Sequence, residues 1–197
     1  PREKQLTFLN LLRKSTDCEY LVISGSLPKG IDETYYEEII KLCKEKSIEL
    51  ILDISSKKLK ELMSYNPLLI KPNDEEVEKI FGFKADTEVN IKLALKKLHQ
   101  LGAKNILLTL GEQGLYFYNG KRILYCNAPK IELCSSACAG DSALAAFLSE
   151  WIYGTDLELA LKKSSATGAN VAESEARGNL EKVEQYIKKL SVKEVGK

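Results

Sequence analysis

Short apolar runs alternate with longer amphipathic stretches along most of this chain. The short runs are continuous rather than alternating between apolar and polar residues, which is typical of strands buried on both faces of a parallel sheet. The stretches between them have the apolar spacing of helices that cover such a sheet. The pattern therefore predicts a single α/β domain over residues 1–197, with a doubly wound, mostly parallel sheet and helices on both faces.

The predicted elements have recognisable ends. Strands are expected at 20–23, 50–54, 68–71 and 106–109, and a hairpin of 115–118 and 122–125 around Asn119-Gly120. Helices are expected at 3–14, 32–46, 56–64, 74–81, 87–101, 141–153, 156–169 and 180–190. Asn73 and Asn179 are expected to cap the fourth and the last helix, and Thr34 with Glu37 has the spacing of a capping box.

The composition is that of a globular protein with little net charge. Of the 197 residues, 44% are hydrophobic and 29% are charged, and the formal net charge is +1. This balance gives no electrostatic reason to expect a nucleic acid or a membrane surface as partner. The five cysteines lack zinc or redox spacing, which favours reduced thiols and a cytoplasmic location. A single histidine disfavours a Cys/His metal site and a Ser-His-Asp hydrolase.

Unusual residues gather where the predicted strands end. In open parallel sheets, ligands bind at the carboxyl ends of the strands. Those ends carry Ser24–Gly30, Asp53, Lys71–Asn73, Thr109–Gly114 and Cys138–Asp141. We therefore expect all of these segments at one edge of the sheet.

The segment Ser136–Ser142 consists of small residues and one carboxylate, and it leads into an apolar helix. Small residues let the backbone approach a ligand closely, and the first N–H groups of a helix can bind an anion. A carboxylate in that turn is favoured by the helix dipole and can accept a proton. Asp141 would equally serve as an ordinary helix cap, so the segment indicates phosphoryl transfer only together with the other loops.

Four motifs follow one another in the chain: Ser24–Gly30, Lys71–Glu76, Thr109–Gly114 and Ala139–Ser142. With these motifs the chain resembles the ribokinase-like (PfkB) carbohydrate kinases over nearly all of its length. The Ser-Gly-Ser-Leu-Pro loop is similar to that of the tagatose-6-phosphate kinase and 1-phosphofructokinase branch. The resemblance implies ATP- and Mg²⁺-dependent phosphorylation of a sugar phosphate such as tagatose 6-phosphate or fructose 1-phosphate.

The resemblance makes Asp141 the base that takes the proton from the attacking sugar hydroxyl. Ala139, Gly140 and the amide of Asp141 would form an anion hole for the transferring phosphoryl group. Cys138 stands where the family usually has Gly. If this position needs a positive φ, a side chain there costs about 1–2 kcal/mol, and its Cβ would crowd the path of the phosphate. A thiol at a helix N-terminus can be reactive, which leaves redox control open.

Asn73 and Glu76 match the Asn-x-x-Glu motif that the resemblance associates with Mg²⁺ and phosphate. They also have the spacing of a capping box, and the two roles are compatible. Asp53 would help to hold Mg²⁺ through water. Lys71 either faces the phosphates or extends its amine to the surface.

The resemblance assigns the other motif residues to the nucleotide and the sugar. Those expected at the nucleotide are Thr109, Gly111, Gly114, Gly168 and Asn170, and those expected at the sugar or its phosphate are Ser26 and Lys29. The glycines of the Thr109 loop permit close approach of ribose and phosphate, or simply form the turn into the hairpin. The Ser24–Gly30 loop either contacts the sugar or its phosphate, or forms a Pro-Gly turn that binds no ligand.

The opening portion of the family is absent from the chain. Its first strands, a sugar-binding Asp, a Gly-Gly loop and the small β-sheet lid all precede the equivalent of Pro1. We therefore expect this chain to expose apolar surface. We also expect it to transfer phosphate poorly by itself, because the lid is what excludes water from the reaction. A homodimer, as formed through the lid in this family, would need the missing portion. The alternative to an enzyme is a non-catalytic module that binds a nucleotide or a sugar phosphate.

Overall fold

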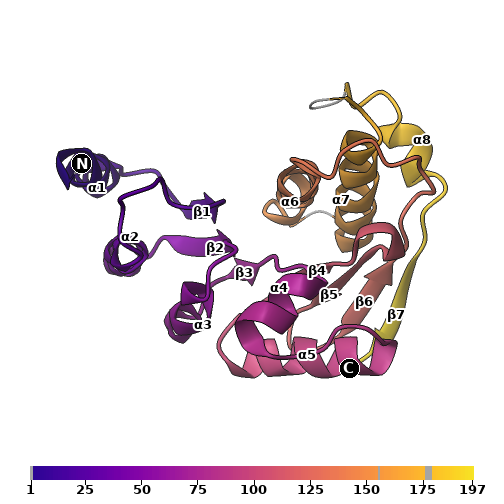
Figure 1. Cartoon of the computed structure of the whole chain (residues 1–197), viewed down its shortest axis with the longest axis horizontal. Helices are drawn as coiled ribbons and strands as arrows, with labels where there is room; N and C mark the ends of the chain where they lie inside the picture. Colours follow the sequence, from indigo (N-terminus) through magenta and orange to yellow (C-terminus); the bar gives the residue numbers. More distant parts are fainter. Residues whose placement is uncertain (1, 155, 176–178) are drawn as a thin grey trace. The chain divides into compact units, whose positions relative to one another are not determined.

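The computed structural model describes residues 2–154, 156–175 and 179–197. The chain forms two compact units, Pro1–Ile106 and Leu107–Lys197. In the described ranges, the strands are hydrogen-bonded in chain order from β1 to β7, and they make a mixed, mostly parallel sheet with helices in the connections (Figure 1). This confirms the predicted α/β class. None of the helices described is long and apolar enough to cross a membrane.

The first unit consists of parallel strands joined by helices (Figure 1). Its strands are β1 (Tyr20–Ser24), β2 (Glu49–Asp53) and β3 (Leu69–Ile70), and β4 (Ile106–Thr109) pairs with β3 through Ile106. Its helical segments are α1 (Arg2–Lys14), α2 (Thr34–Glu45), α3 (Lys58–Leu62), the 3-10 turn η1 (Met63–Tyr65), α4 (Asp74–Glu76), the π-helical turn η2 (Val77–Phe81) and α5 (Glu88–Gln100). Because β1 and β2 are parallel, Ser24 lies opposite Asp53, and both strands end at the same edge.

In this unit α4 begins at the predicted cap, Asn73, and α5 begins at Thr87, a cap that was not predicted. The Thr87 hydroxyl accepts a hydrogen bond from the Asn90 amide at 3.2 Å and begins α5. The capping box predicted for Thr34 and Glu37 is wrong, because Glu33 occupies the N-cap position of α2 and makes no side-chain cap. Glu37 is instead drawn into an ion pair with Lys58.

The second unit holds the antiparallel part of the sheet and three helices. The strands β5 (Leu115–Tyr118), β6 (Ile123–Cys126) and β7 (Val192–Gly196) are paired antiparallel, β5 with β6 and β6 with β7. The helical segments are η3 (Gly111–Gln113), α6 (Ala139–Trp151), α7 (Leu157–Ala172) and α8 (Val183–Ile187), and α6 and α7 lie side by side (Figure 1). The hairpin predicted around Asn119 is confirmed, and the Asn119 Oδ1 accepts hydrogen bonds from two amides of the turn.

The end of this unit differs from the prediction. The Asn179 side chain accepts from the Glu181 amide at 3.2 Å, but Leu180 has φ 61°, so the helix does not begin there. Only Val183–Ile187 is α-helical, within the predicted span of 180–190. The strand β7 was not predicted, because two of its five residues are charged and the segment becomes a strand by pairing with β6.

Exposed apolar side chains, which were expected, occur on the first two elements of the chain and also further along it, where Val89 and Tyr153 are 75% and 81% exposed. Leu6, Phe8 and Leu11 of α1 are exposed, Leu11 by 64%. Val22 of β1 is 43% exposed, whereas Ile51 and Leu52 of the neighbouring β2 are fully buried. Among the strands that the structure describes, β1 pairs with β2 alone, and this edge position accounts for the difference between the two parallel strands.

Candidate active site

The loops after β1 and β2 surround a cavity of about 560 Å³ in the first unit. Its polar lining consists of Ser26, Lys29, Glu33, Tyr36, Ser55, Ser56 and Lys57. Gly25 has φ 84°, and its amide donates to the Asp53 carbonyl at 3.0 Å, which fastens the first loop to the end of β2. Hydroxyl groups and two amines suit a polar ligand that carries negative charge, such as a phosphate.

Asp53 and Lys71 form a buried ion pair in the same unit. The Lys71 Nζ lies 3.0 Å from the Asp53 Oδ1, and the Ser24 hydroxyl donates to the other carboxylate oxygen at 3.3 Å. Lys71 is only 6% exposed, so the prediction that its amine might extend to the surface is wrong. A buried charge needs a partner, and here each of the two residues supplies it for the other.

Asn73 and Glu76 form a complete capping box at the start of α4. The Asn73 Oδ1 accepts from the Glu76 amide at 2.8 Å, and the Glu76 Oε2 accepts from the Asn73 amide at 3.0 Å. The second carboxylate oxygen, Oε1, accepts a hydrogen bond from the hydroxyl of Ser55 in the loop after β2. The capping half of the prediction is confirmed, and the carboxylate is held in one orientation from two sides.

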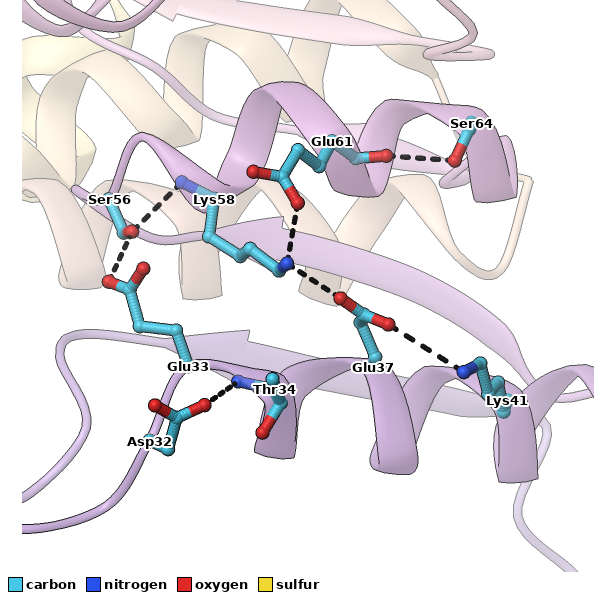
Figure 2. A network of polar contacts seen from close by, with 9 residues as sticks. All are labelled: Asp32, Glu33, Thr34, Glu37, Lys41, Ser56, Lys58, Glu61 and Ser64. Atoms are coloured by element: carbon cyan, nitrogen blue, oxygen red, sulfur yellow. Dashed lines mark hydrogen bonds and ion pairs between the residues drawn. The ribbon is translucent and has the colours of Figure 1, made fainter.

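A second network connects the helices behind the cavity (Figure 2). The Lys58 Nζ lies 2.6 Å from Glu37 on α2 and 2.5 Å from Glu61 on α3. These contacts lower the pKa of the Glu37 carboxyl and raise that of the Lys58 ammonium, in both cases chiefly through their hydrogen bond. The Ser56 hydroxyl donates to Glu33 at 2.6 Å, so the network also fixes two residues of the cavity wall.

In the second unit, the loop after β4 contains two glycines with different roles. Gly111 has φ 56°, and a Cβ built on it would meet no atom within 4 Å. Gly114 has φ 92°, and a Cβ there would lie 2.1 Å from the Cys126 carbonyl oxygen. The close approach of backbone to backbone therefore accounts for Gly114, whereas Gly111 leaves open space beside the end of β4 at Thr109.

The start of α6 is formed by a strained backbone. Cys138 occupies the N-cap position with φ 63° and ψ −4°, which lies in the left-handed region. This is the positive φ for which backbone strain was predicted at this residue. Its side chain makes no cap, and the Ala139 amide donates to the Ser136 carbonyl at 3.3 Å. Gly140 and Asp141 follow in the first turn, where the helix dipole favours a negative charge.

Gly168 and Asn170 have packing roles on α7. A Cβ on Gly168 would lie 3.2 Å from the Cβ of Ala143 and 3.4 Å from the Ala139 carbonyl, so this glycine lets α7 approach the start of α6. Asn170 is 1% exposed, and its amide donates to Ser174 and accepts from the Lys182 amide. Contact of either residue with adenine stays a prediction.

The sequence did not point to Ser55, Ser56 or Glu33. A signal for the serines was present, because they follow Asp53 at the end of a predicted strand, where ligands bind. Glu33 has no such signal, since its bond to Ser56 joins two loops 23 residues apart. In the residues that the structure describes, no three His, Cys, Asp or Glu side chains gather in a metal-binding group.

A mixed α/β sheet with these loops at its strand ends is the architecture of known sugar kinases. The fold superimposes on that of phosphofructokinase-2 from Escherichia coli, solved in complex with substrates and products, with a TM-score of 0.85 at 22% identity. The match covers 95% of this chain and 62% of that one, and at this identity it shows the fold. Residues 4–182 match the family described as pfkB family carbohydrate kinase, and the chain belongs to that family.

Its similarity to individual relatives confirms the predicted branch. The chain is 48% identical to the D-tagatose-1-phosphate kinase of Klebsiella oxytoca over 174 residues, which is 88% of this chain and 57% of the relative. It is 31% identical to the 1-phosphofructokinase of Bacillus subtilis over 186 residues, 94% of this chain and 61% of the relative. The chain thus spans about three fifths of the length of these proteins.

Proposed function

We propose that the full-length protein is an ATP-dependent kinase of ketohexose phosphates. The observation that carries the proposal is the position of Asp141, in the first turn of α6 directly after a small-residue turn, in a chain of the pfkB family. Tagatose 1-phosphate is the first substrate to test, because a 48% identical relative is named as its kinase. Tagatose 6-phosphate and fructose 1-phosphate are the other candidates.

In the proposed reaction, Asp141 accepts the proton of the substrate hydroxyl while that oxygen bonds to the γ-phosphorus and the bond to ADP breaks. The backbone amides of Gly140 and Asp141 stabilise the charge on the transferring group, because amides at a helix start point toward an anion. The Ala139 amide, which donates to the Ser136 carbonyl, joins them only when that 3.3 Å hydrogen bond opens. Thr109 and Gly111 contact the nucleotide, and Ser26 and Lys29 contact the phosphate that the substrate already carries.

Glu76 is suited to hold Mg²⁺ on the nucleotide. Proteins usually bind this ion through one or two carboxylates together with waters and substrate phosphates, so a cage of three acids is not needed. The Glu76 carboxylate is oriented on both oxygens and is partly exposed. Asp53 is less suited, since Lys71 already balances its charge. When bound, Mg²⁺ would neutralise the phosphates and align them.

The test is ATP-dependent phosphorylation of the three ketohexose phosphates by the full-length protein. Asp141→Asn is expected to lower kcat by about 10²–10⁴-fold, the usual contribution of a general base. The matched control is Asp156→Asn, because Asp156 is likewise a carboxylate at the start of a helix in this unit, and Asn preserves the cap that Asp156 makes on α7. Equal rates for wild type and Asp141→Asn would remove Asp141 from this role.

A non-catalytic binding module is the second candidate, and the conformation of Cys138 favours it. Cys138 has a left-handed backbone, and we expect its Cβ to crowd the path of the transferring phosphate. Calorimetry distinguishes the two functions. Binding of ATP without turnover of any of the three sugars, in wild type and in Cys138→Gly alike, identifies a module, whereas turnover identifies a kinase.

A further inference from the structure

Ser55 joins two groups of residues that the proposed function uses separately. It lies in the loop between β2 and α3, and it lines the cavity that also contains Ser26 and Lys29. Its hydroxyl donates to Oε1 of Glu76, which lies 21 residues further along the chain at the start of α4. A single side chain therefore contacts both the cavity and the Asn-x-x-Glu segment of the first unit.

The capping box alone does not determine how the Glu76 carboxylate is turned. One oxygen, Oε2, is bound to the Asn73 amide at 3.0 Å, and a carboxylate held at one oxygen can still rotate about that contact. The hydrogen bond from Ser55 fixes the other oxygen. Because the acceptor is ionised, such a bond is stronger than one between neutral groups.

We propose that Ser55 is a positioning residue that orients the Glu76 carboxylate toward Mg²⁺ on the nucleotide; this inference rests on the proposed kinase function. Outer residues of this kind commonly change metal affinity or activity by about 10–100-fold when they are replaced. The role differs from a direct contact with the sugar, although Ser55 also lines the cavity, and the two roles have different kinetic signatures.

The experiment measures the rate of the full-length protein against Mg²⁺ concentration and, separately, against sugar phosphate concentration. Ser55→Ala is expected to raise the Mg²⁺ concentration for half-maximal rate by about 10–100-fold and to leave the KM for the sugar phosphate unchanged. Ser55→Thr retains the hydroxyl and is expected to retain the wild-type Mg²⁺ requirement. A rise in the sugar KM alone, or an unchanged Mg²⁺ requirement, overturns the proposal.

Ser64→Ala is the matched control. The Ser64 hydroxyl donates to the Glu61 carbonyl at 2.8 Å (Figure 2), and the described residues show no hydrogen bond from it to Glu76. Thermal unfolding of the three variants separates a general loss of stability from a loss of orientation. A shift in the Mg²⁺ requirement of Ser64→Ala equal to that of Ser55→Ala contradicts the positioning role.

A second readout keeps this inference separate from the proposed function. Calorimetric titration of ADP with and without Mg²⁺ reports how far the ion strengthens nucleotide binding, and it does not need turnover. Ser55→Ala is expected to reduce that strengthening by about 10-fold or more. If the wild type phosphorylates none of the three sugars, the kinase proposal fails. If the Mg²⁺ effect on ADP binding is the same in wild type and Ser55→Ala, the Ser55 proposal fails.

Discussion

Two candidate carboxylates of the first unit, Glu76 and Asp53, are held by other side chains, whereas the glycine and cysteine turns of the second unit are placed by backbone conformation. Glu76 is bound by Ser55 and Asn73, and Asp53 is bound by Lys71. In the second unit, Gly111, Gly114 and Cys138 all have positive φ, and the side chain of Cys138, the N-cap residue of α6, makes no cap hydrogen bond.

This difference fits the chemistry proposed for each region. A carboxylate that is to hold a cation must keep a fixed direction, and hydrogen bonds from neighbouring side chains supply that direction. An anion hole needs amide groups that point outward, which requires an unusual turn of the backbone rather than a side chain. Substitutions that remove a side-chain hydrogen bond in the first unit, or that change a positive-φ residue in the second, test this difference between the two units.

The largest effect is expected at Gly114. Gly114→Ala places a Cβ 2.1 Å from the Cys126 carbonyl in a backbone with φ 92°, so strain and overpacking together are expected to cost about 2–4 kcal/mol of unfolding free energy. Gly111→Ala is the control, because it has φ 56° and open space, and the backbone strain alone costs about 1–2 kcal/mol. Urea unfolding measures both, and equal losses would contradict the distinction between the two glycines.

The next effect concerns the side-chain support of the first unit. Asn73→Ala removes the acceptor for the Glu76 amide and is expected to cost about 1 kcal/mol of unfolding free energy. Asn73→Asp retains an acceptor oxygen and is expected to stay near wild type. Urea unfolding provides the measurement. A loss of the same size in Asn73→Asp would show that the cap hydrogen bond is not the source of the stability.

The sequence predicts the features that depend on local patterns. The apolar runs predict most of the strands, and Asn73 is a predicted cap with a local signature. Strain at Cys138 was predicted for the case of a positive φ, and the residue has φ 63°. Contacts between distant segments were not predictable. The Asp53–Lys71 and Ser55–Glu76 pairs form only once parallel strands bring their loops together. Glu37, expected in a capping box with Thr34, forms an ion pair with the distant Lys58 instead, and Glu33 is the N-cap residue of α2.

Cys138→Gly is expected to produce a small gain in stability. Glycine removes a left-handed strain of about 1–2 kcal/mol and adds an unfolded-state entropy cost of about 0.4–1 kcal/mol, so the net gain is about 1 kcal/mol or less. Cys138→Ala keeps a Cβ and is expected to give no gain. Thermal unfolding distinguishes them, and a gain in Cys138→Ala would indicate that the thiol rather than the backbone is the source of strain.

The smallest effect tests the side-chain network of the first unit through pH. The hydrogen bond from Lys58 lowers the pKa of the Glu37 carboxyl in the folded protein. Because the pKa is lowered on folding, the Glu37–Lys58 pair stabilises the folded protein fully at any pH above the unfolded pKa of about 4.3. That stabilisation is lost as the pH falls through the pKa of the folded protein. The difference in Tm between wild type and Glu37→Gln is therefore expected to be greatest at neutral pH and to shrink below about pH 4.

Glu75→Gln is the control for this experiment, because it removes an ion pair that is open to solvent. The Glu75 and Lys79 side chains are 71% and 72% exposed, whereas the Lys58 side chain is only 12% exposed. Water and salt screen the exposed pair, so its loss is expected to change Tm less at every pH. If Glu37→Gln and Glu75→Gln lower Tm by the same amount, the Lys58 network stabilises the first unit no more than an ordinary surface ion pair does.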